Sequence, residues 1–170
     1  MKFNKDDINL LASFVKRNIL SVNEVNDWCY AQFTEQGAPE WIEKMALATD
    51  RQEVLDIITS NFGVYGELNF EYQAGEISYE YKNGLLILHQ AIYMLLYDVY
   101  PDDEELKSEK TKLYIAEDYY DWHDHPDIVA KKEAQPIFDK YYSKYAKSRK
   151  LFNVKHIDTA HITMAYNGLS

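Results

Sequence analysis

The residues best suited to chemistry in this chain lie between Asp118 and Asp127, where two histidines stand among four aspartates. Imidazole nitrogens and carboxylate oxygens are ligands that zinc and other divalent metals accept. However, His123 and His125 are two residues apart, whereas a ligand pair on one helix face needs the spacing of H-E-x-x-H. A helix end that runs into a polar loop before Pro126 accounts for the same residues. We therefore predict no metal site and no cofactor, and we keep a metal-dependent enzyme as the lesser alternative.

Other catalytic signatures are missing from the sequence. The single cysteine, Cys29, follows Trp28 in an apolar helical pattern, which is typical of a small buried hydrophobic residue and not of a nucleophile. Six glycines are scattered singly, and they form neither a dinucleotide-binding motif nor a Walker motif. The sequence therefore predicts that the protein is not an enzyme.

Charge is strongly segregated along the chain. Residues 64–127 contain 15 acidic residues, 4 lysines and 10 of the 15 tyrosines, whereas residues 128–170 contain 8 basic and 3 acidic residues. An acidic surface steers a basic protein toward it, and tyrosine supplies a large contact area at low entropic cost. We therefore predict that the acidic region carries a docking face for a basic protein. The predicted contact residues are Glu67, Glu71, Tyr72, Glu76, Tyr79, Glu80, Tyr81, Asp102, Asp103, Glu104 and Glu105.

The basic region that follows permits two interpretations. Lysines alternate with Tyr141, Tyr142 and Tyr145 between Pro136 and Lys150, which superficially suits nucleic acid. A net charge of −10 and an isoelectric point near 4.9 argue against binding to a phosphate backbone. We therefore predict no nucleic-acid partner. The basic stripe is interpreted as a solvated helix face or as an internal counter-charge for the acidic middle region.

Helix boundaries are clear in the first third of the chain. Asn4 can cap a helix that continues to about Asn18, and Ser21 to Glu24 has the form of a capping box that begins a second helix. Pro39 suits the first turn of a third helix, and a fourth begins in the capping-box manner with Thr49 as its cap. Short helices joined by tight turns favour antiparallel neighbours.

Two interpretations are open for residues 66–82. Two stretches of alternating apolar and polar residues flank a turn near Gly75, which predicts a β-hairpin. Helical spacing also puts Leu68, Tyr72 and Tyr79 on one side. Without the hairpin, we expect this region to be a loop that leads into the next helix.

Two later helices are predicted from the residues at their N-termini. The acids from Asp102 to Glu105 suit a helix N-terminus, where negative charge complements the helix dipole, so capping alone also accounts for them. Pro136 suits the first turn of a further helix that continues through Arg149. The predicted fold is mainly α, a compact bundle of about six to seven short helices with a central β-hairpin over about 66–82.

Length and composition indicate one domain and a reducing compartment. A chain of 170 residues with 46% apolar content can bury a core and is short enough for a single domain, 1–170. A lone cysteine and an N-terminus without an apolar signal segment favour the cytoplasm. The longest apolar run, Leu85 to Val99, is interrupted by polar residues and is shorter than a spanning helix, so no membrane contact is predicted. The sequence does not specify an oligomeric state.

The chain resembles two groups of bacterial proteins. The segment from Asn18 to Trp28, followed by 38–42 and 53–55, is similar to the N-terminal half of a family of bacterial proteins of about this length. Small size, acidic charge and a middle region rich in aromatic residues and carboxylates resemble immunity proteins, the cytoplasmic antidotes of contact-dependent and other polymorphic toxin systems.

The resemblance to immunity proteins implies that the protein binds a cognate toxin, often a basic nuclease, and blocks its active site or an essential surface. Carboxylates of the docking face would pair with the Lys and Arg that the toxin uses on its own substrate. Tyr72, Tyr79 or Tyr81 would act as aromatic anchors at the centre. The alternative is a helical adaptor or regulatory protein that uses the same face for a resident cellular partner.

Overall fold

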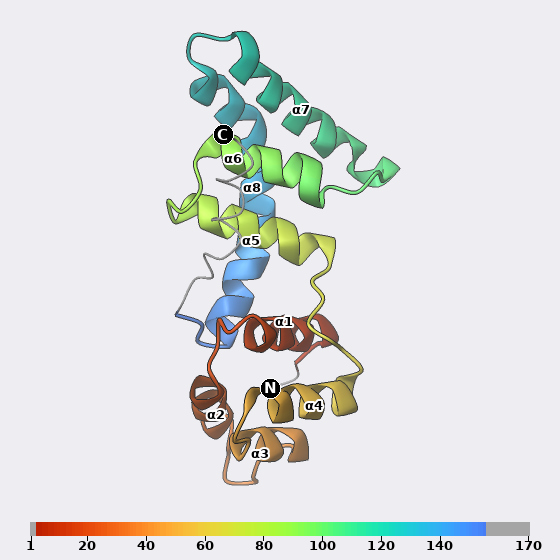
Figure 1. Ribbon diagram of the computed structural model, residues 1–170, viewed down its shortest axis with the longest axis vertical. Helices are drawn as coiled ribbons and strands as arrows, with labels where there is room; N and C mark the ends of the chain where they lie inside the picture. The colour runs from red at the N-terminus through yellow and green to blue at the C-terminus, as the bar shows by residue number, and fades with distance from the viewer. Residues whose placement is uncertain (1–2, 156–170) are drawn as a thin grey trace. The chain divides into compact units, whose positions relative to one another are not determined.

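The computed structural model describes residues 3–155, and every regular element within them is a helix (Figure 1). The prediction of a mainly α fold is confirmed, and the eight α-helices of the described residues slightly exceed the predicted number. Contacts divide the described chain into two compact units, residues 3–68 with 148–155 and residues 69–147. Compactness is not independent folding, so the single domain stays a prediction.

The first unit contains four short helices and the end of the last helix. These are α1 (Lys5–Lys16), α2 (Val22–Tyr30), α3 (Glu40–Ala46) and α4 (Arg51–Phe62). Figure 1 shows them in red to yellow, and the packed pairs are α1 with α4, α2 with α3 and α3 with α4. The first four helices predicted from the sequence are therefore present.

Local caps begin these helices much as the sequence predicts. Asn4 caps α1, and Ser21 and Glu24 form the reciprocal capping box of α2, with the Ser21 amide donating to the Glu24 carboxylate at 2.9 Å. At α4 the cap is Asp50 and not Thr49, because the Asp50 carboxylate accepts a first-turn amide at 2.9 Å. The prediction for that helix is wrong by one residue.

An aromatic cluster fills the centre of the first unit. The Trp28 ring lies 5.3 Å from Phe3, 6.4 Å from Trp41 and 5.2 Å from Phe152 between ring centroids. The indole N–H of Trp28 donates to the carbonyl of Leu151 at 2.9 Å. Residues near position 150 therefore complete a core built from the first helices.

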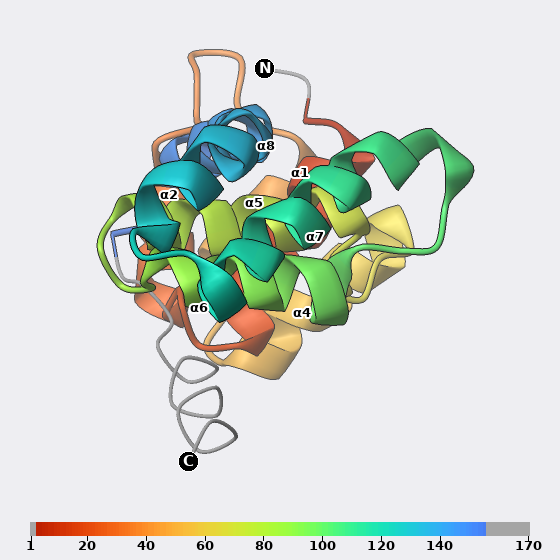
Figure 2. The ribbon, with the colours of Figure 1, turned by 90° about the horizontal axis from the view of Figure 1, so that it is seen from above.

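The second unit contains the remaining helices. They are α5 (Phe70–Lys82), α6 (Leu88–Tyr93), the π-helix η1 (Met94–Val99), the 3-10 turn η2 (Glu104–Leu106), α7 (Lys107–Trp122) and α8 (Pro126–Leu151), whose last residues belong to the first unit. Seen from above, α6 and α7 lie side by side (Figure 2), as they do in Figure 1. No helix formed by the described residues is both long and apolar enough to cross a membrane.

The β-hairpin predicted over about 66–82 is wrong, because residues 70–82 form the helix α5. The side chain of Asn69 caps this helix by accepting a first-turn amide at 3.1 Å. The sequence pattern alternates only when the large apolar residues alone are considered. Small buried residues lie between them and complete an apolar stripe at helical spacing. The loop alternative is wrong for the same reason. The buried residues of α5 are Tyr72, Ala74, Gly75, Ile77, Ser78 and Glu80.

The last helix also begins earlier than predicted. It begins at Pro126 and passes through Pro136, so the prediction that Pro136 begins a helix is wrong. A proline inside a helix removes one hydrogen bond and costs about 3 kcal/mol. Buried residues at helical spacing on both sides of the proline share one core, and their packing offsets that cost. These residues are Ala130, Ala134, Ile137, Phe138 and Tyr141.

Gly75 sets the close approach of α5 to α8. A Cβ added to Gly75 would lie 2.7 Å from the Cβ of Tyr145 and 3.0 Å from the carbonyl oxygen of Tyr141. Neither atom is the movable end of a side chain, so the helices would have to separate. The residue that suggested a turn in the sequence is therefore a contact point inside a helix.

We expect Gly75→Ala to lower the free energy of unfolding by about 1–3 kcal/mol, the usual cost of overpacking. Urea unfolding followed by far-UV circular dichroism measures the change. Alanine in an open helix position would instead stabilise the protein by roughly 0.5–1 kcal/mol. A stabilised variant would therefore contradict the close approach of these two helices.

Candidate functional site

Most of the predicted docking residues on α5 contact α8. Glu71 pairs with Lys144, and Glu76 accepts a hydrogen bond from the hydroxyl of Tyr145 at 2.8 Å. Tyr72 is only 3% exposed, and the Lys144 ammonium lies 4.8 Å from its ring centroid. These residues bind the basic helix within the same unit. Of the two interpretations of the basic stripe, these contacts support the internal counter-charge.

The three remaining predicted residues of α5 are also buried or in contact with α8. Tyr79 stacks on Tyr142 with ring centroids 5.8 Å apart, and Tyr81 packs against Phe138 at 4.7 Å. Glu80 is buried, with 2% of its surface exposed. A partner would have to displace these contacts before it could use the rings as anchors.

The predicted run from Asp102 to Glu105 is exposed and lies at the entry to α7. Asp102 pairs with Lys110, whose hydrogen bond lowers the pKa of the Asp102 carboxyl, and Glu104 lies 3.2 Å from Lys107. Asp103 accepts the Glu105 amide at 2.9 Å, which confirms the capping interpretation.

The last predicted residue, Glu67, belongs to the first unit. Its carboxylate lies 2.6 Å from the ammonium of Lys16. Both side chains are largely exposed, so the pair contributes little to stability. The other predicted docking residues all belong to the second unit.

Glu109 is the centre of a partly buried polar cluster that the sequence does not reveal. Its carboxylate accepts from the hydroxyl of Tyr100 at 2.6 Å, from the hydroxyl of Tyr141 at 2.8 Å and from the Lys140 ammonium at 2.6 Å. Burial opposes ionisation, but the hydrogen bonds from Lys140, Tyr100 and Tyr141 outweigh it and lower the pKa of Glu109. Every one of these groups is used internally, so the cluster is structural.

Exposed tyrosines gather elsewhere, on α6, η1 and α7. Tyr93, Tyr97 and Tyr114 are 42%, 50% and 46% exposed. The ring centroid of Tyr97 lies 4.7 Å from that of Tyr93 and 6.2 Å from that of Tyr114. Tyr97 lies within the π-helical turn, a geometry that is frequent at functional sites. Three tyrosine rings thus form one exposed cluster without being buried in the core.

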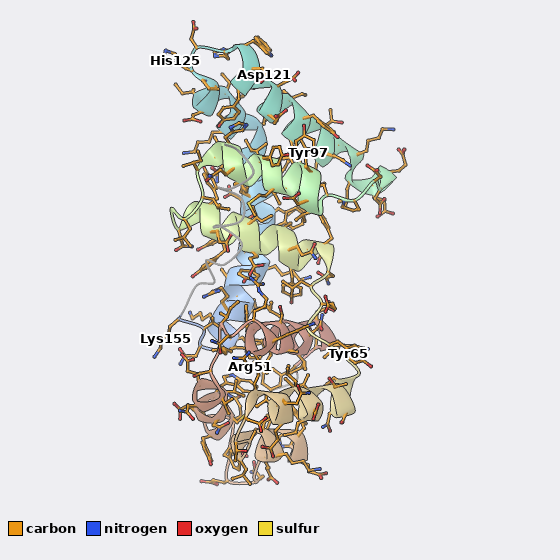
Figure 3. The ribbon with its side chains drawn as sticks, in the orientation of Figure 1. Arg51, Tyr65, Tyr97, Asp121, His125 and Lys155 are labelled. Atoms are coloured by element: carbon orange, nitrogen blue, oxygen red, sulfur yellow. The ribbon has the colours of Figure 1, made fainter. Side chains whose placement is uncertain are left out.

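Carboxylates on α7 adjoin this cluster. Partial burial of the Tyr97 ring raises its pKa, and the nearby negative charges of Glu117 and Asp118 add to the shift. Neither Glu117, Asp118 nor Asp121 forms an ion pair with another residue in the part of the chain that the structure describes. Figure 3 shows Tyr97 on the side of η1 toward α7, and Asp121 close to the end of α7. We call the set Tyr93, Tyr97, Tyr114, Glu117, Asp118 and Asp121 the acidic tyrosine face.

Helical spacing explains how α7 presents its part of this face. Tyr114, Glu117, Asp118 and Asp121 recur at intervals of three and four residues, which places them on one side of a helix. Leu113 and Ala116 are fully buried on the adjoining stripe, and Glu117, at its border, is half-buried. The sequence prediction missed these residues because it followed runs of charge. An i, i+3, i+4, i+7 stripe of tyrosine and carboxylates was the available signal.

Of the residues that suggested metal chemistry, His123, Asp124 and His125 lie in an exposed turn between α7 and α8, and the other aspartates lie on the two helices. The helix α7 ends at Trp122, as predicted, and the amide of His125 donates to Nδ1 of His123 at 3.2 Å within the turn. Within residues 3–155, no three His, Cys, Asp or Glu side chains come together as a metal site would need.

Burial raises the pKa of Cys29 to about 12, so its thiol is not ionised at neutral pH.

Comparisons of this chain with protein-family models, curated proteins and solved structures find no match. A functional proposal therefore depends on the geometry and charge described above.

Proposed function

We propose that the protein binds a basic partner protein through the acidic tyrosine face, and that it acts as an immunity protein that neutralises a cognate bacterial toxin in the cytoplasm. The observation that carries this proposal is a cluster of three exposed tyrosine rings next to carboxylates on α7. These carboxylates have no ion-pair partner among the described residues. The face differs from the one predicted from the sequence, although it lies in the same acidic region.

Ion pairs within the protein are the reason why the proposed docking face differs from the one predicted from the sequence. Glu71 and Glu109 are neutralised by lysines of α8, so their charge contributes less to an outside partner. Asp118 is exposed and Glu117 is half-buried, and neither pairs with a basic residue among the described residues, so both carboxylates are available to steer a basic protein during encounter. The outer half of α7 is therefore the better candidate.

The tyrosines supply contact area, which charge alone does not provide. Tyrosine rings bury a large area on contact and have few rotatable bonds, so binding costs little side-chain entropy. Ring-to-ring contacts among Tyr93, Tyr97 and Tyr114 already restrict these side chains before a partner arrives. Such a preorganised aromatic centre with a charged border is typical of binding hot spots.

A toxin that acts on nucleic acid would meet this face with the cations that hold its own substrate. Occlusion of those cations would block the toxin without any catalytic group on the antidote. Such a contact needs carboxylates and aromatic surface, and the acidic tyrosine face supplies both.

Growth rescue combined with binding kinetics tests the proposal. The candidate target is a toxin domain encoded directly beside the gene of this chain, and it would be expressed alone and together with the protein. We expect co-expression to restore growth and the double variant Glu117→Lys/Asp118→Lys to abolish rescue. We also expect this variant to slow association at low salt by about tenfold or more.

A matched double variant separates the two candidate faces. Glu104→Lys/Glu105→Lys changes the net charge by the same amount at another exposed site, so we expect it to retain rescue. Loss of rescue only in this second variant would return the docking site to the residues predicted from the sequence. Equal behaviour of both variants would contradict a local docking face. Failure of rescue with retained binding to a resident protein would favour the adaptor.

A further inference from the structure

Three times in the second unit, a lysine lies over a tyrosine ring while it pairs with a carboxylate. The ammonium-to-centroid distances are 4.5 Å for Lys82 over Tyr142, 4.8 Å for Lys140 over Tyr141 and 4.8 Å for Lys144 over Tyr72. The carboxylates bound by these lysines are Asp139, Glu109 and Glu71, respectively. The arrangement combines a cation–π contact with an ion pair.

The acidic tyrosine face contains two of these three components. Tyr97 supplies the ring, and its centroid lies 6.2 Å from that of Tyr114 on α7. Glu117 and Asp118 lie three and four residues beyond Tyr114 on the same helix, so they supply carboxylates beside the ring pair. No lysine or arginine in the described part of the chain pairs with either carboxylate or lies over the Tyr97 ring. The cation is the missing component.

We infer that the acidic tyrosine face binds a cationic side chain of the partner over the Tyr97 ring, with Glu117 and Asp118 neutralising its charge. The inference rests on the proposed function and names the chemistry of its central contact. A ring at this position does more than fill space, because its π face attracts a cation directly.

Arginine suits this site better than lysine. Its planar guanidinium stacks on an aromatic ring and still presents several N–H groups to carboxylates, whereas an ammonium is a compact, strongly hydrated charge. The Tyr93 and Tyr114 rings are inclined by 48° and 80° to the Tyr97 ring, so neighbouring ring surfaces border the site. We therefore expect a preference for arginine-rich segments.

The direct test uses short peptides and needs no identified partner. A hepta-arginine peptide, a hepta-lysine peptide and a hepta-citrulline peptide would be titrated into the full chain by calorimetry at low salt. Citrulline keeps the shape of arginine without its charge. We expect the dissociation constants to rise in the order arginine, lysine, citrulline, with no measurable binding of citrulline.

Variants of Tyr97 separate the π contact from general charge attraction. We expect Tyr97→Leu to weaken hepta-arginine binding by about threefold to tenfold, the effect of losing a partly exposed cation–π contact. Tyr97→Phe keeps the π face and should stay within about twofold of the wild type. The triple variant Tyr93→Leu/Tyr97→Leu/Tyr114→Leu prevents a neighbouring ring from substituting, and circular dichroism confirms that each variant is folded.

The outcomes distinguish this inference from the proposed function. If the leucine variants bind hepta-arginine as the wild type does, while Glu117→Lys/Asp118→Lys does not bind, the cation–π contact is overturned and charge-based docking stands. Equal affinity for arginine and citrulline would overturn both. Weakening in the leucine variants together with loss in the charge-reversal variant supports both.

Discussion

Replacing Trp28 with alanine should destabilise the first unit by about 3–5 kcal/mol, the range for truncating a buried large aromatic side chain. Trp28 is 6% exposed and its ring contacts Phe3, Trp41 and Phe152. The variant also leaves the carbonyl of Leu151 without its indole donor. Urea unfolding monitored by circular dichroism measures the loss.

Two controls define what the Trp28 result means. Trp28→Phe keeps much of the ring volume but removes the N–H donor, so we expect a smaller loss of about 1–2 kcal/mol. Trp122→Ala removes the same side chain from a position that is 68% exposed, and should change stability by less than about 0.5 kcal/mol. Equal effects at Trp28 and Trp122 would contradict a core at Trp28.

Replacing Glu109 with alanine should cost about 2–4 kcal/mol, because the hydroxyls of the buried residues Tyr100 and Tyr141 lose their acceptor. Lys140 loses its ion-pair partner in the same variant, but it is half exposed and water can solvate it. Glu109→Gln retains an oxygen acceptor and should cost less. Glu105→Ala, at an exposed position of the same segment, should be nearly neutral.

The acid dependence of stability provides an independent measure of Glu109. Its folded pKa is lowered, so its contribution is fully present above the unfolded value of about 4.3 and is lost as the pH falls through the lowered folded pKa. We expect the wild type to lose stability more steeply than Glu109→Ala as the pH falls from about 5 to about 3. Asp102 and Asp139 also have lowered pKa values, but they are present in both proteins. Identical slopes would show that Glu109 is not held in its ionised form.

The helix boundaries that were predicted correctly depend on short-range chemistry. A cap joins residues three positions apart, as in the capping box of Ser21 and Glu24 or the cap at Asn4. Such contacts join residues that are close in the sequence, so the sequence alone indicates them. The burial of Cys29 was predictable for a related reason, because helical spacing places it on an apolar side.

The errors occur where packing between distant elements outweighs local preference. Gly75 favours a turn by itself, yet contact with Tyr145 on α8 makes it an interior helix residue. Pro136 favours a helix start, yet shared burial on both sides keeps it inside α8. Neither outcome can be read from a window of a few residues.

The acidic, tyrosine-rich character of the middle region and the mainly helical class of the fold were determined by the sequence alone, because composition, charge and local caps are properties of the chain itself. The helix α5 in place of the predicted hairpin was not. Only the tertiary structure decided which carboxylates face outward. Glu71 meets its lysine 73 residues away and Glu109 meets its lysine 31 residues away, whereas Glu117 and Asp118 meet none among the described residues. A partner is attracted mainly by the carboxylates that remain unpaired once the internal ion pairs have formed. Which carboxylates remain unpaired depends on packing between helices that are distant in the chain.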